Sequence, residues 1–139
     1  MILDTTRGSE LKSTIYINKH IIIDALGHRI ESKADPAFLL EEANCGIRNM
    51  VLFSVPSNHP DYPLANDLVV CNKAGGRFVP LIENCYFGYT KGHALHLAGV
   101  QQTTIKTLQI AGRETTLMVS MAYTLRTLLM ALWHQTISL

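Results

Sequence analysis

Residues 35–55 read Asp-Pro-Ala-Phe-Leu-Leu-Glu-Glu-Ala-Asn-Cys-Gly-Ile-Arg-Asn-Met-Val-Leu-Phe-Ser-Val, and this stretch decides the predicted fold. Asp35 can cap a helix whose first residue is Pro36, the one helical position that tolerates proline well. The later Asn-Cys-Gly run provides the left-handed exit that often ends a helix. The pattern therefore predicts a helix that begins at Pro36 and ends at Cys45, followed by a buried strand over residues 50–55.

The segment before this stretch contains one clear strand and one ambiguous element. Ser13–Ile17 is rich in β-branched and aromatic residues, which favours a short strand. Lys19–Leu26 is flanked by residues that can cap a helix. The alternative is a strand that continues through Ile23, because three consecutive isoleucines prefer a pleated surface. Residues 1–12 are expected to be a loosely ordered N-terminal segment.

The segment after it contains extended elements and one long amphipathic one. Leu68–Cys71 and Arg77–Ile82 flank a glycine-rich turn, which predicts a β-hairpin. Thr103–Ile110 alternates in polarity and is predicted to be a half-exposed strand. Residues 114–135 are predicted to form a long terminal helix, because polar residues recur at helical spacing along one side. A strand over Thr115–Val119 is left open by the β-branched start of this segment.

This order of elements bounds the fold class. A chain of 139 residues is expected to form a single domain spanning residues 1–139. The order lacks the strict βαβ alternation of a doubly wound sheet, and no internal repeat or linker is recognised. We therefore predict an α+β fold with an antiparallel or mixed sheet of about five strands, two or three helices packed on it, and a long C-terminal helix.

Composition argues against several classes of function. The twelve basic and eleven acidic residues are dispersed along the chain, so the basic footprint of a nucleic-acid-binding surface is missing. Cys45, Cys71 and Cys85 form neither a CxxC pair nor a disulfide framework, which favours the cytoplasm. The apolar C-terminal segment is interrupted by Arg126 and by a polar stripe, so membrane contact is not expected.

The terminal segment also suggests self-association. Its methionines and leucines cover most of the circumference of the predicted 114–135 helix, and such a helix must be covered nearly all round. A domain with 47% apolar residues has more apolar surface than one small core hides easily. We therefore expect a homo-oligomer that forms through the 114–135 helix.

The segment from Cys85 to His96 concentrates side chains that transfer protons, bind metals or stack on rings. The pair His93-x-x-His96 would need at least one further ligand to hold zinc, for which Glu83, Cys85 and His59 are the candidates. No recognised metal motif surrounds the pair, so neither a metal nor another cofactor is predicted.

An acid–base site can be built from residues in the predicted loops. His93 or His59 would act as a base, and Glu83 or Asp61 would orient it. Alternatively, Cys85 would act as a nucleophile activated by a histidine. The candidate catalytic residues, should the chain be an enzyme, are His93, His59, Glu83 and Cys85.

A ligand site uses the same region in another way. Aromatic side chains offer ring faces and basic side chains offer contacts to anions. The candidate ligand-binding residues are Tyr62, Tyr89, Lys91, Arg113 and Arg48. The pocket would form between the 56–66 loop and the 83–96 segment.

The favoured hypothesis is a small soluble protein that binds a small polar or anionic ligand, such as a nucleotide, as a homo-oligomer. One alternative is a small hydrolase, lyase or isomerase that uses a histidine with a carboxylate or cysteine partner. Another is a structural or interaction protein without a ligand. No family is recognised in the sequence.

Overall fold

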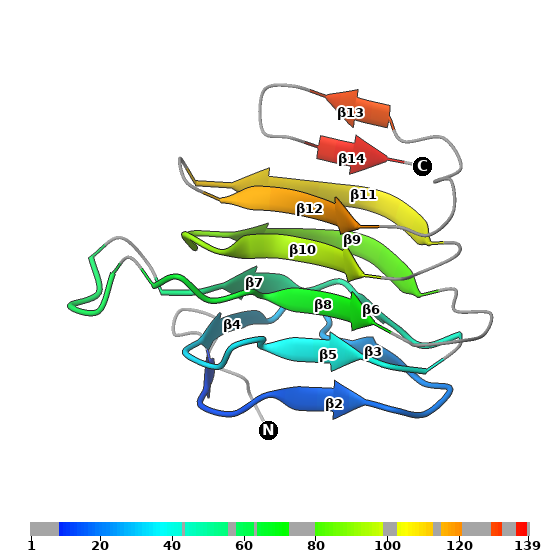
Figure 1. Cartoon of the computed structure of the whole chain (residues 1–139), viewed down its shortest axis with the longest axis horizontal. Coiled ribbons are helices and arrows are strands. Elements are labelled where there is room, and N and C mark those ends of the chain that lie inside the picture. Colours follow the sequence, from blue (N-terminus) through cyan, green and yellow to red (C-terminus); the bar gives the residue numbers. More distant parts are fainter. Residues whose placement is uncertain are drawn as a thin grey trace.

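The computed structural model of the chain describes residues 9–42, 44–55, 58–62, 64–72, 80–98, 103–112, 115–120, 129–131 and 136–138. Every regular element in these residues is a β-strand, and most strands pair in parallel. Successive turns of the chain stack on one another to form a β-solenoid (Figure 1). The predicted α+β fold is therefore wrong.

Two sheets form opposite walls of the solenoid. Sheet B contains five strands in the order β12 (Thr116–Ser120), β10 (His93–Ala98), β8 (Val69–Asn72), β5 (Phe38–Leu40) and β2 (Ile15–Ile17). The main path of sheet A is β1 (Ser9–Leu11), β4 (Arg29–Ser32), β7 (Val51–Phe53), β9 (Leu81–Gly88), β11 (Thr104–Ala111), β14 (Thr136–Ser138) and β13 (Leu129–Ala131). Beside this path, β3 (Ile22–Asp24) pairs with β6 (Gly46–Arg48), which pairs with the first half of β9.

Stacked apolar side chains fill the space between the sheets. Ile23, Ile47, Ile82 and Ile105 occupy the same register position in four successive coils, 24, 35 and 23 positions apart along the chain. The last three of these isoleucines are fully buried. Parallel neighbours lie about 4.8 Å apart, so one isoleucine per coil forms a continuous column.

A second column consists of residues in the left-handed backbone region, at the bend within sheet A. Asn49, Asn84 and Thr107 have φ angles of 52°, 49° and 54°. Asparagine tolerates this region because its short side chain bonds locally. The Asn84 carboxamide donates to Asn49 Oδ1 at 2.9 Å, and the Asn49 carboxamide donates to Asp24 Oδ1 at 3.0 Å. This asparagine ladder fixes the bend in one coil on the bend in the next.

The two predicted N-terminal helices are wrong. In place of the predicted helix from Pro36 to Cys45, the structure has the strand β5 and then a turn into β6. Phe38 and Leu40 are buried while Leu39 between them is half-buried, which is the alternation of a strand. In the other segment Ile22 and Ile23 are extended in β3 (Ile22–Asp24), but the alternative of one strand through Ile23 is also wrong, because β2 ends at Ile17 and lies in the other sheet.

The predicted hairpin is also wrong. β8 lies in sheet B, where it pairs in parallel with β5 and β10. β9 lies in sheet A between β11 on one side and β6 and β7 on the other. Residues 73–79, which include most of the predicted turn, lie outside the described residues. The two segments therefore belong to consecutive walls of one coil.

The predicted terminal helix over residues 114–135 is contradicted by β12 and β13, which lie within it. β12 matches the alternative strand over Thr115–Val119, and it pairs in parallel with β10. A homo-oligomer that forms through a terminal helix consequently loses its basis. Residues 114, 121–128 and 132–135 of this segment fall outside the described part of the chain.

Three predicted strands are confirmed: Ser13–Ile17 contains β2, Met50–Val55 contains β7, and Thr103–Ile110 overlaps β11. Within the predicted N-terminal segment, β1 pairs with β4, and residues 1–8 are not described. No helix in the described ranges is long and apolar enough to cross a membrane.

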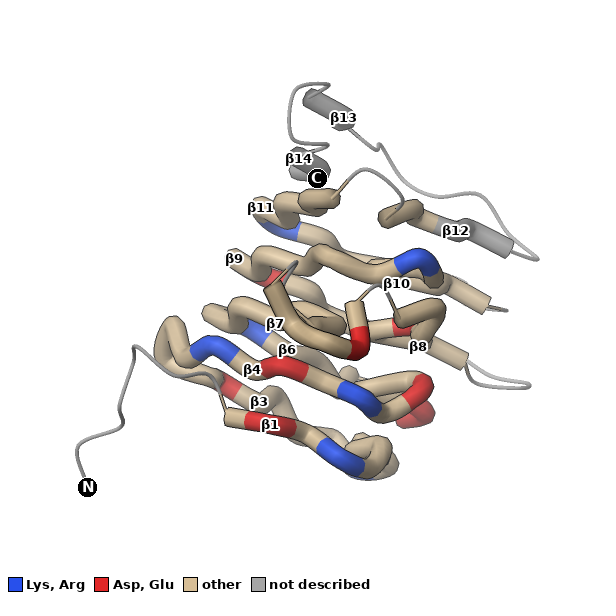
Figure 2. Tube along the Cα trace, turned by 90° about the vertical axis from the view of Figure 1, so that its left-hand side faces the viewer, with Lys and Arg blue, Asp and Glu red and all other residues tan. Residues whose placement is uncertain are grey.

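Charged residues of both signs lie on the coils near the N-terminal end of the solenoid (Figure 2). Arg29 pairs with Glu31 at 2.6 Å, and Arg48 pairs with Asp24 at 2.9 Å. Within each pair the two opposite charges neutralise each other on the outer surface of sheet A.

Candidate metal centre

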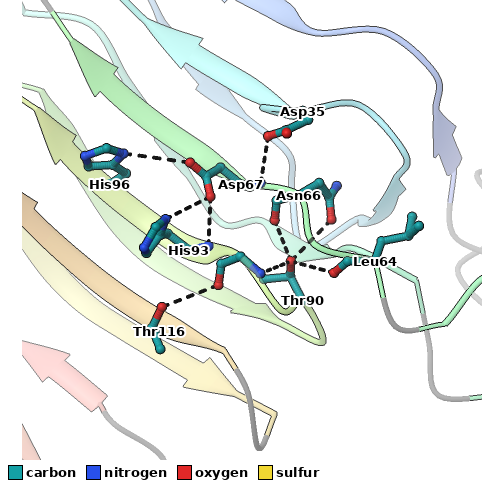
Figure 3. A network of polar contacts seen from close by, with 9 residues as sticks. Asp35, Leu64, Asn66, Asp67, Thr90, His93, His96 and Thr116 are labelled. Carbon is teal, nitrogen blue, oxygen red and sulfur yellow. Dashed lines mark hydrogen bonds and ion pairs between the residues drawn. The ribbon is translucent and has the colours of Figure 1, made fainter.

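Asp67, His93 and His96 meet on the outer face of sheet B (Figure 3). His93 Nδ1 lies 2.9 Å from Asp67 Oδ1, and His96 Nδ1 lies 3.7 Å from Asp67 Oδ2. One donor atom from each residue lies within 4.8 Å of the other two. The side chains of Asp67, His93 and His96 are 25%, 34% and 23% exposed, so a solute can reach them.

An irregularity in β10 places both histidines on one face. In a regular strand, residues three positions apart point to opposite faces. The pairing of β10 with β12 shifts register between His93 and Leu95, as a β-bulge does. Both intervening residues, Ala94 and Leu95, are completely buried. His93 and His96 therefore both lie on the outer face.

Asp67 is fixed by contacts with the coils on both sides. Its backbone N–H donates to Asp35 Oδ1 at 2.9 Å, and its carbonyl accepts from Ala37 at 3.1 Å. Its side chain contacts the following coil, where Oδ1 also accepts the backbone N–H of His93 at 2.9 Å. One carboxylate oxygen thus holds the start of β10, while the other faces His96.

A buried polar column supports this arrangement from the corner of the solenoid. Asn66 donates to the carbonyls of Ser32 and Ala34 at 3.2 and 2.8 Å. Thr90 donates to the carbonyl of Asn66, and Thr115 donates to the carbonyl of Thr90 at 3.0 Å. These bonds link successive coils directly beside Asp67 and fix the backbone that carries it.

Gly92 allows the carboxylate of Asp67 to lie where it does. A Cβ atom at position 92 would lie 2.9 Å from Asp67 Oδ1 and 2.6 Å from the carbonyl carbon of Asn66. Such distances are below van der Waals contact, so glycine is required for the backbones to approach this closely.

The separations of the donor atoms are close to those in a tetrahedral metal site. With bonds of about 2.05 Å to nitrogen and oxygen, two ligand atoms of tetrahedral zinc lie about 3.3 Å apart. The separations of 2.9 Å from His93 Nδ1 to Asp67 Oδ1 and of 3.7 Å from His96 Nδ1 to Asp67 Oδ2 lie on either side of this value. A histidine nitrogen binds a metal through its lone pair, so the proton that His93 Nδ1 donates to Asp67 must move to Nε2 or be lost before Nδ1 can coordinate.

Without a metal, the same residues form an Asp–His pair. The Nδ1–H group of His93 donates to the Asp67 carboxylate, which orients the ring and directs Nε2 away from the pair. A carboxylate that orients an imidazole in this way is a recurring component of acid–base sites.

His59, Asp61 and Tyr62 lie in a separate place, the segment between β7 and β8. The backbone N–H of Asp61 donates to His59 Nδ1 at 3.1 Å, and Tyr62 N–H donates to the carbonyl of His59 at 3.0 Å. Asp61 pairs with Lys33 at 3.0 Å, and this hydrogen bond lowers the pKa of the Asp61 carboxyl. These contacts form a turn, and none of them joins His59 to His93.

Glu83 and Cys85 lie in sheet A, away from His93. Cys85 is buried, and burial raises the pKa of its thiol to about 11, so the thiolate is scarce at neutral pH. The side chain of Glu83 is registered between Arg48 and Lys106 on neighbouring strands. Neither residue is the partner of His93, whose carboxylate partner is Asp67.

The predicted ligand-binding residues are dispersed. Arg48 pairs with Asp24, and Tyr89 packs edge-to-face on Phe53 with ring centroids 4.9 Å apart. The backbone N–H of Lys91 donates to the carbonyl of Leu64 at 2.8 Å, at the edge of the metal centre. Arg113 lies outside the described residues. The predicted set thus does not form one pocket in the described structure.

Asp67 is the functional residue that the sequence reasoning missed. Asp67 precedes Val69, the first residue of β8, by two positions, and His93 precedes Leu95 of β10 by two positions. Leu95 pairs with Val69, so Asp67 and His93 occupy equivalent positions in adjacent coils. Alignment of the chain with itself at these positions would have brought Asp67 and His93 together.

Comparison with protein-family models, with curated proteins and with solved structures found no match to this chain.

Proposed function

We propose that the protein binds a divalent transition-metal ion through Asp67, His93 and His96, and that this ion receives a small polar or anionic ligand. The observation that carries the proposal is the convergence of two imidazoles and one carboxylate within 4.8 Å on an accessible surface. Zinc sites with three protein ligands keep a further position for water or substrate.

The donor set selects among metals. Imidazole nitrogen suits zinc, copper, nickel and iron, whereas calcium and magnesium prefer oxygen ligands. A 2-His-1-carboxylate set with open positions is also the set that binds non-haem iron(II). The expected ion is therefore a transition metal, for which zinc serves as the probe.

The open position determines the class of ligand. A bound cation favours oxygen donors with negative charge, such as carboxylate or phosphate groups. The anionic ligand expected from the sequence would therefore bind to the metal itself, and not to Arg48 or Tyr89, which lie in sheet A or at its edge and have other partners.

A hydrolytic enzyme is the second candidate function. The 2.9 Å contact between His93 Nδ1 and Asp67 favours it, because the orienting carboxylate leaves Nε2 to accept a proton. A panel of activated esters tests it: hydrolysis by wild type that falls at least about a hundredfold in His93→Gln supports catalysis. Equal rates for the two proteins exclude it.

Calorimetric titration with zinc tests the metal proposal. Wild-type protein is expected to bind one ion per chain. His96→Gln and Asp67→Asn are expected to bind at least about tenfold more weakly, since even the loss of a residue that only hydrogen-bonds to a metal ligand has that effect. His20→Gln is the matched control, because His20 is an exposed histidine whose contact is with Glu42 at 4.0 Å. Its zinc affinity should equal that of wild type.

The possible outcomes distinguish a residue that binds the metal from a residue that only stabilises the fold. Weaker binding in His96→Gln with unchanged thermal stability of the metal-free protein supports a ligand role, because His96 approaches Asp67 Oδ2 at 3.7 Å and the ring of His93 at 5.4 Å between centroids, both of them members of the site itself. Equal affinity in wild type and His96→Gln refutes the site. Cobalt-loaded protein tests the open position, since inorganic phosphate should then change its visible absorption.

A further inference from the structure

A groove of about 210 Å³ crosses the outer surface of sheet A at its bend. Its lining comes from four successive coils, so the groove is directed along the solenoid axis and across the strands. The lining residues are Gly27, Asn49, Met50, Val51, Asn84, Cys85, Tyr86, Thr107 and Gln109. This surface is in the opposite sheet from the metal centre.

The polar groups among these lining residues are neutral. Asn49, Asn84 and Gln109 present carboxamides, and Thr107 and Tyr86 present hydroxyls. Burial raises the pKa of Cys85 and of Tyr86, so both groups stay protonated at neutral pH. Neutral amides and hydroxyls can both donate and accept, which suits a ligand whose groups are also mixed donors and acceptors.

The polar groups are also held in a fixed row. The asparagine ladder joins Asn84 to Asn49 and Asn49 to Asp24, at 2.9 and 3.0 Å. The bond between the asparagines uses one of the two N–H groups of the Asn84 carboxamide, and the second N–H group and Oδ1 of this exposed residue have no other hydrogen bond within the described part of the chain. Residues of adjacent coils repeat about every 4.8 Å, so the row presents hydrogen-bonding groups at regular intervals.

An immobilised aromatic ring forms part of the groove. Tyr86 packs edge-to-face on Phe53 with ring centroids 5.6 Å apart, and the Arg29 guanidinium lies 5.0 Å from the centroid of Phe53. The ring of Tyr86 is therefore already ordered, so a ligand that contacts it does not have to restrict its rotation.

We infer that this groove binds a neutral, hydroxyl-rich chain, such as an oligosaccharide, that lies along the solenoid axis. Carboxamides and hydroxyls from three coils hydrogen-bond successive hydroxyl groups, and Tyr86 contacts an apolar sugar face. The inference does not depend on the metal proposal, since it concerns different residues on the other sheet.

The size and charge of the groove distinguish this ligand from others. Pockets that enclose a drug-sized molecule measure roughly 300–1,000 Å³, so a volume of 210 Å³ suits a short part of a longer chain. A phosphate or carboxylate would need a cationic partner, and the described lining contains none. A wholly apolar ligand would not satisfy the donors and acceptors of these carboxamides that the ladder does not use.

Titration with defined hexasaccharides tests the inference. The neutral probes are hexamers of β-1,4-linked glucose and of β-1,4-linked xylose, and the charged comparison is a hexamer of α-1,4-linked galacturonate. Affinity is measured by calorimetry, and the side-chain carboxamide signals of Asn49, Asn84 and Gln109 are followed by NMR. At least one neutral hexamer is expected to bind and to shift these signals more than the galacturonate hexamer does.

Variants identify the site of binding. Gln109→Ala removes an exposed carboxamide outside the ladder, and Tyr86→Ala removes the ring; each should weaken binding at least about fivefold. Lys106→Ala, an exposed change on the same strand outside the groove, should leave affinity unchanged. If no neutral hexamer binds, if the charged hexamer binds as tightly, or if Gln109→Ala retains full affinity, the inference is overturned.

Discussion

The carboxylate of Asp67 lies 2.9 Å from Nδ1 of His93, although 26 positions separate the two residues in sequence. They meet because the chain completes one coil of the solenoid between them. The corner that holds His93 therefore lies directly beside the corner that holds Asp67. Asp67 therefore has close neighbours one coil away on either side, Asp35 in the preceding coil and His93 in the following one. Sites in this chain are consequently built across coils, and not within a single loop.

Gly92→Ala is expected to disrupt the metal centre. The new Cβ would lie 2.9 Å from Asp67 Oδ1, so the carboxylate must move away from His93. Zinc affinity should fall at least about tenfold by calorimetry. Gly88→Ala is the control, because its Cβ would meet the Ala111 carbonyl at a similar 2.7 Å in the other sheet. If both variants bind zinc like wild type, the close approach of Gly92 to Asp67 is irrelevant to binding.

Gly46→Ala is expected to destabilise the fold. Its Cβ would lie 2.7 Å from the Cβ of Leu81 and would also meet the Leu81 carbonyl oxygen, both on the adjacent strand β9. The free energy of unfolding should decrease by roughly 1–3 kcal/mol, as for other overpacked cores. Urea denaturation measures the change.

Gly27→Asn provides the comparison for that experiment. Gly27 has a φ of 80° with nothing within 4 Å of a built Cβ, and asparagine tolerates the left-handed region. Its unfolding free energy should stay within about 0.5 kcal/mol of wild type. A large decrease in the unfolding free energy of Gly27→Asn would show that this turn does not accommodate a side chain.

The sequence allowed local strand character to be predicted, but not the order of stacking. Ser13–Ile17 and Thr103–Ile110 are strands as predicted, because their β-branched residues favour extended backbone whatever lies beside them. The helix predicted from Pro36 to Cys45 failed because capping residues also suit tight turns. Parallel pairing of β5 with β2 and β8 supplies stability that no local propensity reveals.

The internal repeat was hidden by one insertion. The isoleucine column has spacings of 24, 35 and 23 positions, and the long second spacing contains the loop at residues 56–66. A search at one fixed period therefore loses the register halfway along the chain. His93 was selected for its chemistry, whereas Asp67 required the repeat to be known.

Thr107→Asn is expected to stabilise the protein. Thr107 has a φ of 54°, which a β-branched residue adopts with strain, whereas Asn49 and Asn84 occupy the same position in the preceding coils. Asparagine should relieve the strain and extend the ladder, raising the unfolding free energy by about 1 kcal/mol. Thr104→Asn, at the start of the same strand, should instead be neutral or destabilising. A lower melting temperature for Thr107→Asn would contradict this explanation.

The cysteines are expected to resist alkylation in the native state. Cys45, Cys71 and Cys85 are buried. Burial raises the pKa of Cys71, with a further contribution from Cys45, and raises that of Cys85 to about 11. Iodoacetamide at about pH 8 should therefore modify the thiols only after denaturant is added. Mass spectrometry measures the modification of each cysteine. Rapid modification of Cys85 in the native protein would contradict this prediction and would favour the alternative in which Cys85 is a nucleophile.

Acid is expected to weaken the bend in sheet A through Asp24. The backbone N–H of Leu26, then the Asn49 carboxamide, lower the pKa of the Asp24 carboxyl below its ordinary value of 3.8. A carboxyl with a lowered folded-state pKa stabilises the fold above its unfolded pKa, and this stabilisation is lost as pH falls through the folded pKa.

Urea denaturation between about pH 7 and pH 2 measures this loss. The unfolding free energy of Asp24→Asn should fall less steeply with decreasing pH than that of wild type, because one of the titrating groups has been removed. Parallel curves for the two proteins would show that Asp24 titrates equally in the folded and unfolded states.

The column of left-handed residues has a mechanical consequence. The ladder joins Asn84 to Asn49 and Asn49 to Asp24, and the strands of the described residues likewise pair with the strands beside them, so each coil is held mainly by its neighbours. A pulling force applied to the two ends of the chain should peel coils away one after another. The force–extension curve would then show a sawtooth of small steps, in place of one abrupt rupture.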